Sequence, residues 1–152
     1  MGFMGFMGFM GIRRTIMAVG TFATAINCID GRVQRPVSDW MRIQYSIDFV
    51  DTITQPGPEK TLTQGPQAII GTMRANVDVS VSAHESKLIA IAAHHGCAGN
   101  PVSDEEHQAQ VRAACHAVAE WGLPVRVVGL WVNEWWQVEL IADSAGGSIP
   151  GR

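Results

Sequence analysis

Two short motifs carry the residues of this chain that are best suited to chemistry. The first is Cys-Ile-Asp-Gly-Arg at positions 28–32, and the second is His-His-Gly-Cys at positions 94–97. In an extended segment, residues two apart project to the same side, so Cys28, Asp30 and Arg32 can face one cleft. The glycine before Cys97 lets the backbone turn, so that the His94 imidazole and the Cys97 thiolate can converge. Two sulfurs and one nitrogen form a three-ligand zinc set of the open, catalytic kind, with a fourth position left for water or substrate.

The segments before these motifs are expected to be strands. Residues 20–28 are small or apolar on both alternating faces, and residues 87–94 form a continuous apolar run that ends at His94. Both patterns are typical of strands that are covered on both sides in a parallel sheet. Each motif then lies at the carboxyl end of a strand, where α/β folds place their active sites.

The remaining pattern alternates helices with strands. It predicts an α/β layered fold with a mostly parallel central sheet flanked by helices. A capping-box pattern at Ser103–Glu106 starts one helix, which ends before Gly122 and Pro124. The other expected elements are a helix at 33–43, a strand at 49–54 that stops at 55–58, a helix from Pro66 through Val81, a strand at 125–132 and a further strand at 137–141 beside it.

The composition limits the classes of function. A chain of 152 residues suits one compact domain. Hydrophobic residues make up 47% and charged residues 16%, which indicates that some surface is buried against another subunit. A net charge of −3 argues against a nucleic-acid partner, and no apolar run is long enough for a membrane span. Three cysteines are too few for a disulfide scaffold, so reduced thiols are expected.

The two ends differ from the middle of the chain. Residues 1–17 form a low-complexity apolar segment that begins with three Met-Gly-Phe repeats, residues 18–143 a single zinc-binding α/β domain, and residues 144–152 a flexible tail. The repeat is either a poorly specified tail or an oligomer contact through its phenylalanines. Residues Arg13–Ala25 resemble an export signal, but cleavage there would remove the strand before Cys28, so a cytoplasmic location is expected.

Together the two motifs resemble those of the β-class carbonic anhydrases, C-x-D-x-R after the first strand and H-x-x-C after a later one. The resemblance extends loosely from about Thr21 to Ile141. It implies a zinc ion held by Cys28, His94 and Cys97, with Asp30 and Arg32 as a catalytic pair beside the metal, in a homodimer or higher homo-oligomer. The chain departs from the family at residues 54–58, which replace an Arg-Asn-Ala-Gly-Asn-like loop, and it lacks the upstream Gln and the long amino-terminal helices. It therefore looks like a short, divergent member.

The resemblance implies a zinc lyase that hydrates CO2 reversibly to bicarbonate through a zinc-bound hydroxide. We expect Asp30 to accept the proton of that hydroxide in a hydrogen bond and Arg32 to hold Asp30 in a two-pronged salt bridge. If Arg32 released it, Asp30 could take the fourth zinc position and close the site. Two alternatives stay open: hydrolysis of carbonyl sulfide or carbon disulfide on the same zinc site, and a non-catalytic, zinc-stabilised assembly protein.

Other residues with chemical potential receive simpler interpretations. Cys115 shares a helical stripe with Val111 and Val118, which predicts core packing. His95 lacks ligand spacing and could be a cleft-wall residue, a proton shuttle or neither. The remaining histidines are expected on helix surfaces: His84, His107 and His116. The late tryptophans are expected in the core or in subunit contacts, or, less simply, at a cleft where they would narrow access: Trp131, Trp135 and Trp136.

Overall fold

The structure is a computed structural model that describes residues 20–146. Its sheet has the strand order β2-β1-β3-β4-β5, in which β1 to β4 run parallel and β5 is antiparallel to β4. The predicted α/β fold with a mostly parallel sheet is confirmed. The elements, in chain order, are β1 (Phe22–Asn27), α2 (Gly31–Tyr45), β2 (Phe49–Thr54), α3 (Pro58–Gln64), α4 (Gln67–Ala83), β3 (Leu88–His94), α5 (Asp104–Ala119), β4 (Arg126–Val132) and β5 (Val138–Asp143).

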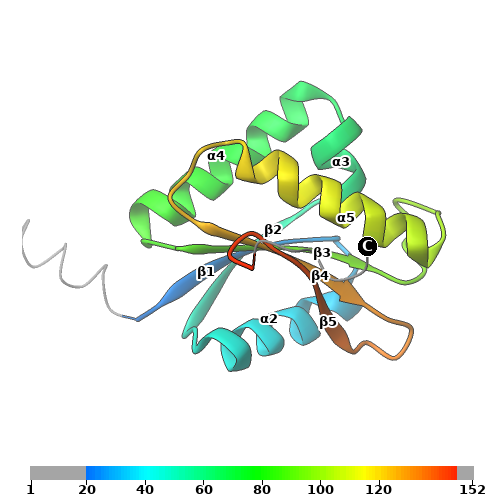
Figure 1. Ribbon diagram of the computed structural model, residues 1–152, viewed down its shortest axis with the longest axis horizontal. Coiled ribbons are helices and arrows are strands. Elements are labelled where there is room, and N and C mark those ends of the chain that lie inside the picture. Colours follow the sequence, from blue (N-terminus) through cyan, green and yellow to red (C-terminus); the bar gives the residue numbers. More distant parts are fainter. Residues whose placement is uncertain (1–19, 147–152) are drawn as a thin grey trace, which may run out of the picture.

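Helices cover both faces of the sheet. Helix α2 lies on one face, and α3, α4 and α5 lie on the other (Figure 1). Successive residues of β1 therefore enter different cores: Ala25 belongs to the same buried cluster as Val37 of α2, whereas Ile26 belongs to the cluster that contains Val77 of α4. All seven residues of β3 are buried. This double coverage explains why the central strands are apolar on both sides rather than alternating with polar residues.

The order of the strands places the loops that carry the two motifs side by side. The chain leaves β1 through α2 to reach β2 on one side, and it later enters β3 on the other side of β1. The loops after β1 and β3 therefore diverge at neighbouring carboxyl ends, which is the usual position of a ligand site in an open α/β sheet.

The predicted elements agree with the structure except around residues 55–64 and at the start of α2. The sequence Gln-Pro-Gly-Pro at 55–58 predicts the end of the strand and no helix, but the short helix α3 begins at Pro58. Proline is well suited to the first helical position, and the preceding Gly57 adopts a left-handed conformation at φ 54°. Helix α2 also begins earlier than predicted, at Gly31, because Asp30 caps it.

Several single-residue predictions can be assessed here. Cys115, Trp131 and the exposed His116 lie where expected. The prediction for His107 is wrong, because its side chain is fully buried and bonds Glu59. His84 is half-buried against Asp51, and Trp135 is largely exposed in the single chain.

None of the helices in residues 20–146 is long and apolar enough to cross a membrane. The Met-Gly-Phe repeat, the first part of the export-signal-like segment and the last residues of the predicted tail lie outside the described residues, so the predictions on them stay predictions.

Candidate metal centre

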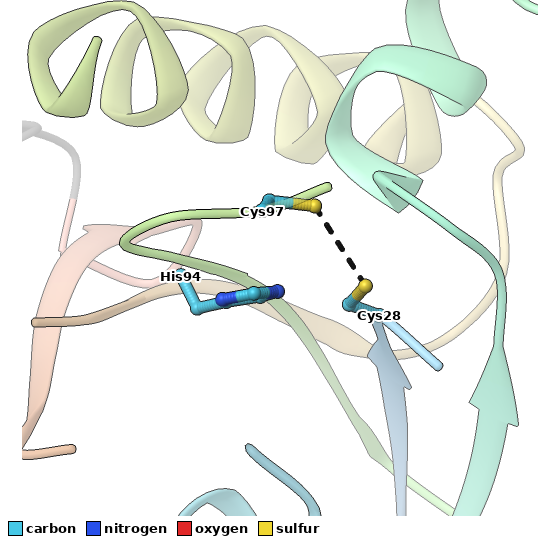
Figure 2. A group of neighbouring side chains, drawn as sticks. All are labelled: Cys28, His94 and Cys97. Carbon is cyan, nitrogen blue, oxygen red and sulfur yellow. Dashed lines mark hydrogen bonds between the residues drawn. The ribbon is translucent and has the colours of Figure 1, made fainter. Parts of the chain in front are cut away.

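Three side chains from the two motifs converge at the carboxyl ends of β1 and β3. Cys28 directly follows β1, His94 ends β3 and Cys97 lies in the turn after β3 (Figure 2). The two sulfurs are 3.7 Å apart, and one ligand atom from each residue lies within 4.8 Å of the others. All three side chains are at most 4% exposed. These residues could therefore hold one metal ion between them.

The orientation of His94 fits a metal ligand. Its Nδ1 donates a hydrogen bond to the backbone carbonyl of His95 at 2.8 Å, which leaves the Nε2 lone pair free to bind a metal. Nε2 is buried and has no hydrogen-bond partner. An unpartnered buried nitrogen is costly, and a metal ion would satisfy it. Two thiols and one imidazole are ligand types that zinc prefers, so the residues fit the metal implied by the sequence.

The Cys97 thiol is not a thiolate by default. Burial and the neighbouring Cys28 raise the pKa of Cys97 to about 11. A divalent cation reverses this effect, because its positive charge favours deprotonated ligands. We therefore expect metal binding at this site to release protons and to weaken at low pH.

The turn that carries Cys28 is fixed by a residue that the motif search did not single out. Gln34, in the second turn of α2, donates hydrogen bonds from its amide to the carbonyls of Cys28, at 2.7 Å, and Asp30, at 3.0 Å. Nothing in the sequence singles out this glutamine, because its role depends on how α2 folds back over the turn.

Asp30 and Arg32 form the predicted two-pronged ion pair, although the chain is not extended there. The Nε and Nη2 atoms of Arg32 bond the two carboxylate oxygens of Asp30 at 3.1 and 2.7 Å, and Asp30 Oδ1 also accepts the Arg32 backbone N–H at 2.9 Å as the α2 cap. The hydrogen bond from the Arg32 side chain lowers the pKa of Asp30 to about 2. Asp30 is therefore a carboxylate, and its Oδ2 lies 3.9 Å from Nε2 of His94.

A tryptophan lies against the other side of this ion pair. The guanidinium of Arg32 is 4.6 Å from the ring centroid of Trp136, whose ring is also 6.2 Å from that of His94. Trp136 adopts a left-handed backbone at φ 63° in the β4–β5 turn, where the side chain of Asn133 accepts hydrogen bonds from two backbone N–H groups. The hairpin thus brings Trp136 beside the candidate site, which is the less simple of the positions expected for the late tryptophans.

His95 points to a different partner. Its Nδ1 lies 2.8 Å from a carboxylate oxygen of Asp104 at the start of α5, and its side chain is 44% exposed. A role in proton transfer stays a prediction.

Comparisons with known proteins agree with this arrangement. A family model described as "Putative carbonic anhydrase" matches residues 18–142. No curated protein matches the chain in sequence. A solved chain of the tetrameric β-carbonic anhydrases from the filamentous ascomycete Sordaria macrospora has a TM-score of 0.53 and 14% identity, with 87% of this chain and 85% of that chain covered. An apo carbon disulfide hydrolase gives a TM-score of 0.45 and 11% identity, with 90% and 86% covered. The first structure shares the fold, and since the family match spans most of the sequence, the chain belongs to this carbonic anhydrase family.

Proposed function

We propose that the protein is a zinc-dependent carbonic anhydrase that converts CO2 and water reversibly to bicarbonate. The observation that carries the proposal is the buried Cys28–His94–Cys97 cluster, whose unpartnered imidazole nitrogen lies beside the ionised Asp30. The family match supports the same class of enzyme. When bound, zinc would acidify a coordinated water and so supply the nucleophile that attacks the carbon of CO2.

Asp30 and Arg32 are proposed as the catalytic pair. Because its pKa is about 2, Asp30 stays an acceptor at all physiological pH values and can take a hydrogen bond from a group in front of His94. Arg32 occupies the outer edges of both carboxylate oxygens and thereby fixes the direction in which Asp30 can accept. Trp136 covers the guanidinium and limits its movement.

The donor set also suggests how activity depends on pH. Two thiolates neutralise the charge of a divalent metal, whereas three imidazoles leave it uncompensated. A water in the fourth position would therefore be less acidic than beside three neutral ligands. We expect activity to rise above neutral pH.

We further propose a homo-oligomer in the cytoplasm. The β-carbonic anhydrases that share the fold are described as tetrameric. Large apolar side chains are exposed on the single chain, and a second subunit would cover such residues: Ile29, Ile43, Phe49, Ile69, Val79, Val102, Trp135 and Leu140. All three cysteines are free, as expected in a reducing compartment.

The test is the turnover of CO2, carbonyl sulfide and carbon disulfide by one zinc-loaded preparation, with Asp30→Asn measured beside it. Asparagine keeps the shape and the helix cap but loses the charge. We expect rapid CO2 turnover that falls in the variant. Faster turnover of carbonyl sulfide or carbon disulfide would show that the sulfur compound, and not CO2, is the substrate. If the zinc-loaded protein turns over none of the three compounds, the result favours the non-catalytic assembly protein.

A further inference from the structure

A cluster of buried polar side chains lies directly under the turn that carries Cys97. Glu59 from α3, Asn100 from the loop after β3 and His107 from α5 are at most 1% exposed. Oε1 of Glu59 accepts hydrogen bonds from Asn100 Nδ2 at 2.8 Å and from His107 Nδ1 at 2.7 Å. Asn100 Nδ2 also donates to Oε1 of Gln110 at 2.6 Å. One carboxylate thus joins two helices to the loop.

Stabilising the packing of α3, α5 and the loop does not by itself explain why these polar side chains are buried. A buried carboxylate has a large desolvation cost, which its partners must offset. Here the compensation is incomplete, because Glu59 Oε2, Asn100 Oδ1 and His107 Nε2 are buried without hydrogen-bond partners. Apolar side chains of similar volume would join the same elements without that cost. A buried polar link of this kind instead fixes one specific geometry.

The geometry that it fixes is that of the Cys97 turn. The backbone N–H of Asn100 donates to the carbonyl of Cys97 at 3.3 Å. Asn100, which Glu59 holds, therefore closes the turn that places the Cys97 sulfur.

The backbones of the two loops are also in close contact. A Cβ atom at Gly99 would lie 2.7 Å from the Cβ of Pro56, and a Cβ at Gly57 would lie 2.7 Å from the Cβ of Asn100. These distances are too short for real side chains, so each glycine is needed where it stands. The segment that leads into Glu59 and the segment that carries Cys97 therefore fit together in one way.

We propose that Glu59 is a positioning residue for the metal centre: through Asn100 it holds the Cys97 turn so that the sulfur is in place before a metal binds. The proposal rests on the metal site of the proposed function. Preorganised ligands do not have to be ordered on binding, so metal affinity is higher. Groups that orient metal ligands typically account for roughly 10–100-fold in metal affinity.

The test is a titration of the metal-free, full-length chain with Co(II), with the affinity and the thiolate-to-cobalt absorption as readouts. Glu59→Leu removes the acceptor, and Glu59→Gln keeps an oxygen at that position. Ser80→Ala is the matched control, because Ser80 is also buried but bonds Thr24 and Asp51. Thermal unfolding of each metal-free variant reports stability separately.

We expect Glu59→Leu to bind Co(II) roughly 10–100-fold more weakly with altered thiolate absorption, and Glu59→Gln to recover most of the affinity. Ser80→Ala should lose stability but keep wild-type cobalt binding. If Glu59→Leu does not fold, Asn100→Ala replaces it, because that variant cuts the link to the turn and keeps the Glu59–His107 pair.

Two results would overturn the inference. One is wild-type cobalt affinity and absorption in the folded Glu59→Leu or Asn100→Ala variant. The other is a loss of affinity in Ser80→Ala that matches its loss of stability. Both leave the proposed function intact, whereas a wild-type chain that binds no cobalt would refute the metal site and this inference together.

Discussion

Nε2 of His94 lies 3.9 Å from Oδ2 of Asp30, although His94 ends β3 and Asp30 follows β1. The nitrogen has no hydrogen-bond partner, and the carboxylate is held from its far side by Arg32. A candidate metal ligand and a fixed acceptor therefore face the same small volume. In the proposed function, this relationship would connect metal binding to catalysis.

Arg32→Ala should lower CO2 hydration while leaving the zinc content unchanged. Without the guanidinium, Asp30 loses its fixed direction and can turn toward the metal. The expected fall in kcat/KM is roughly 10–100-fold, measured by stopped flow. Arg35→Ala is the matched control, because Arg35 lies on the same helix with an 89% exposed side chain and pairs with Asp39. Equal activity in the two variants would contradict the assigned role.

Trp136→Ala should have a smaller effect in the same direction. Stacking of a cation on an aromatic ring at a partly exposed site contributes about 0.5–1 kcal/mol, so kcat/KM should fall about two- to five-fold. The neighbouring Trp135 is 70% exposed, and Trp135→Ala should leave kcat/KM of the subunit unchanged. If Trp135→Ala lowers kcat/KM more than Trp136→Ala does, a subunit contact through Trp135 affects activity more than the contact between Trp136 and Arg32.

The ion pair between Arg126 and Asp143 should make stability depend on pH. Hydrogen bonding from Arg126 lowers the pKa of Asp143, so the folded state favours the ionised carboxylate. The stabilisation is therefore present above the unfolded-state pKa of about 3.9 and is lost as the pH falls through the lower, folded-state pKa. Because Arg126 is 42% exposed, Asp143→Asn should lower the free energy of unfolding by only about 0.5–1 kcal/mol at pH 7.

This difference should shrink in urea unfolding of the metal-free protein as the pH falls below about 4. Asp39→Asn, which breaks an exposed pair on α2, should change little at any pH. If the difference in free energy of unfolding between the wild type and Asp143→Asn grows as the pH falls, the predicted direction of the pH dependence is wrong.

Metal removal should destabilise the wild-type protein. A ligand at about 100 times its dissociation constant adds about 2.7 kcal/mol to folding, which corresponds to a Tm change of roughly 5–10 °C for a chain of this size. Chelation should lower Tm by that amount and abolish CO2 turnover. A chelated protein that unfolds completely would favour the assembly role, and an unchanged Tm would argue against a bound metal.

The sequence predicts the fold well where burial dominates. The strands before Cys28 and His94 are apolar on both faces, and α5 has both a capping box and a stripe through Val111 and Val118, so pattern and structure agree. Prediction fails where tertiary contacts decide. Helix α3 follows a Pro-Gly-Pro stop, and its Glu59 looks like a surface residue until His107 and Asn100 bury it.

The same division holds for the site. Cys28, His94 and Cys97 were identifiable because ligand chemistry restricts residue type and spacing, and the structure brings them together. Gln34 cannot be identified from the sequence, and the sequence leaves the position of Trp136 open, because the path of a helix or a hairpin places each of them. The sequence predicts His107 on the surface, because it does not reveal the buried partner of that side chain.

The most direct measurement is the zinc content of the purified wild-type chain, Cys28→Ser and Cys115→Ser. Cys115 is also buried, but it packs in the core on the other face of the sheet, so its variant controls for the loss of a buried thiol. We expect about one zinc per chain in the wild type and in Cys115→Ser, and little or none in Cys28→Ser. Zinc content that is unchanged in Cys28→Ser, or absent from the wild type, would contradict the assignment of the metal centre.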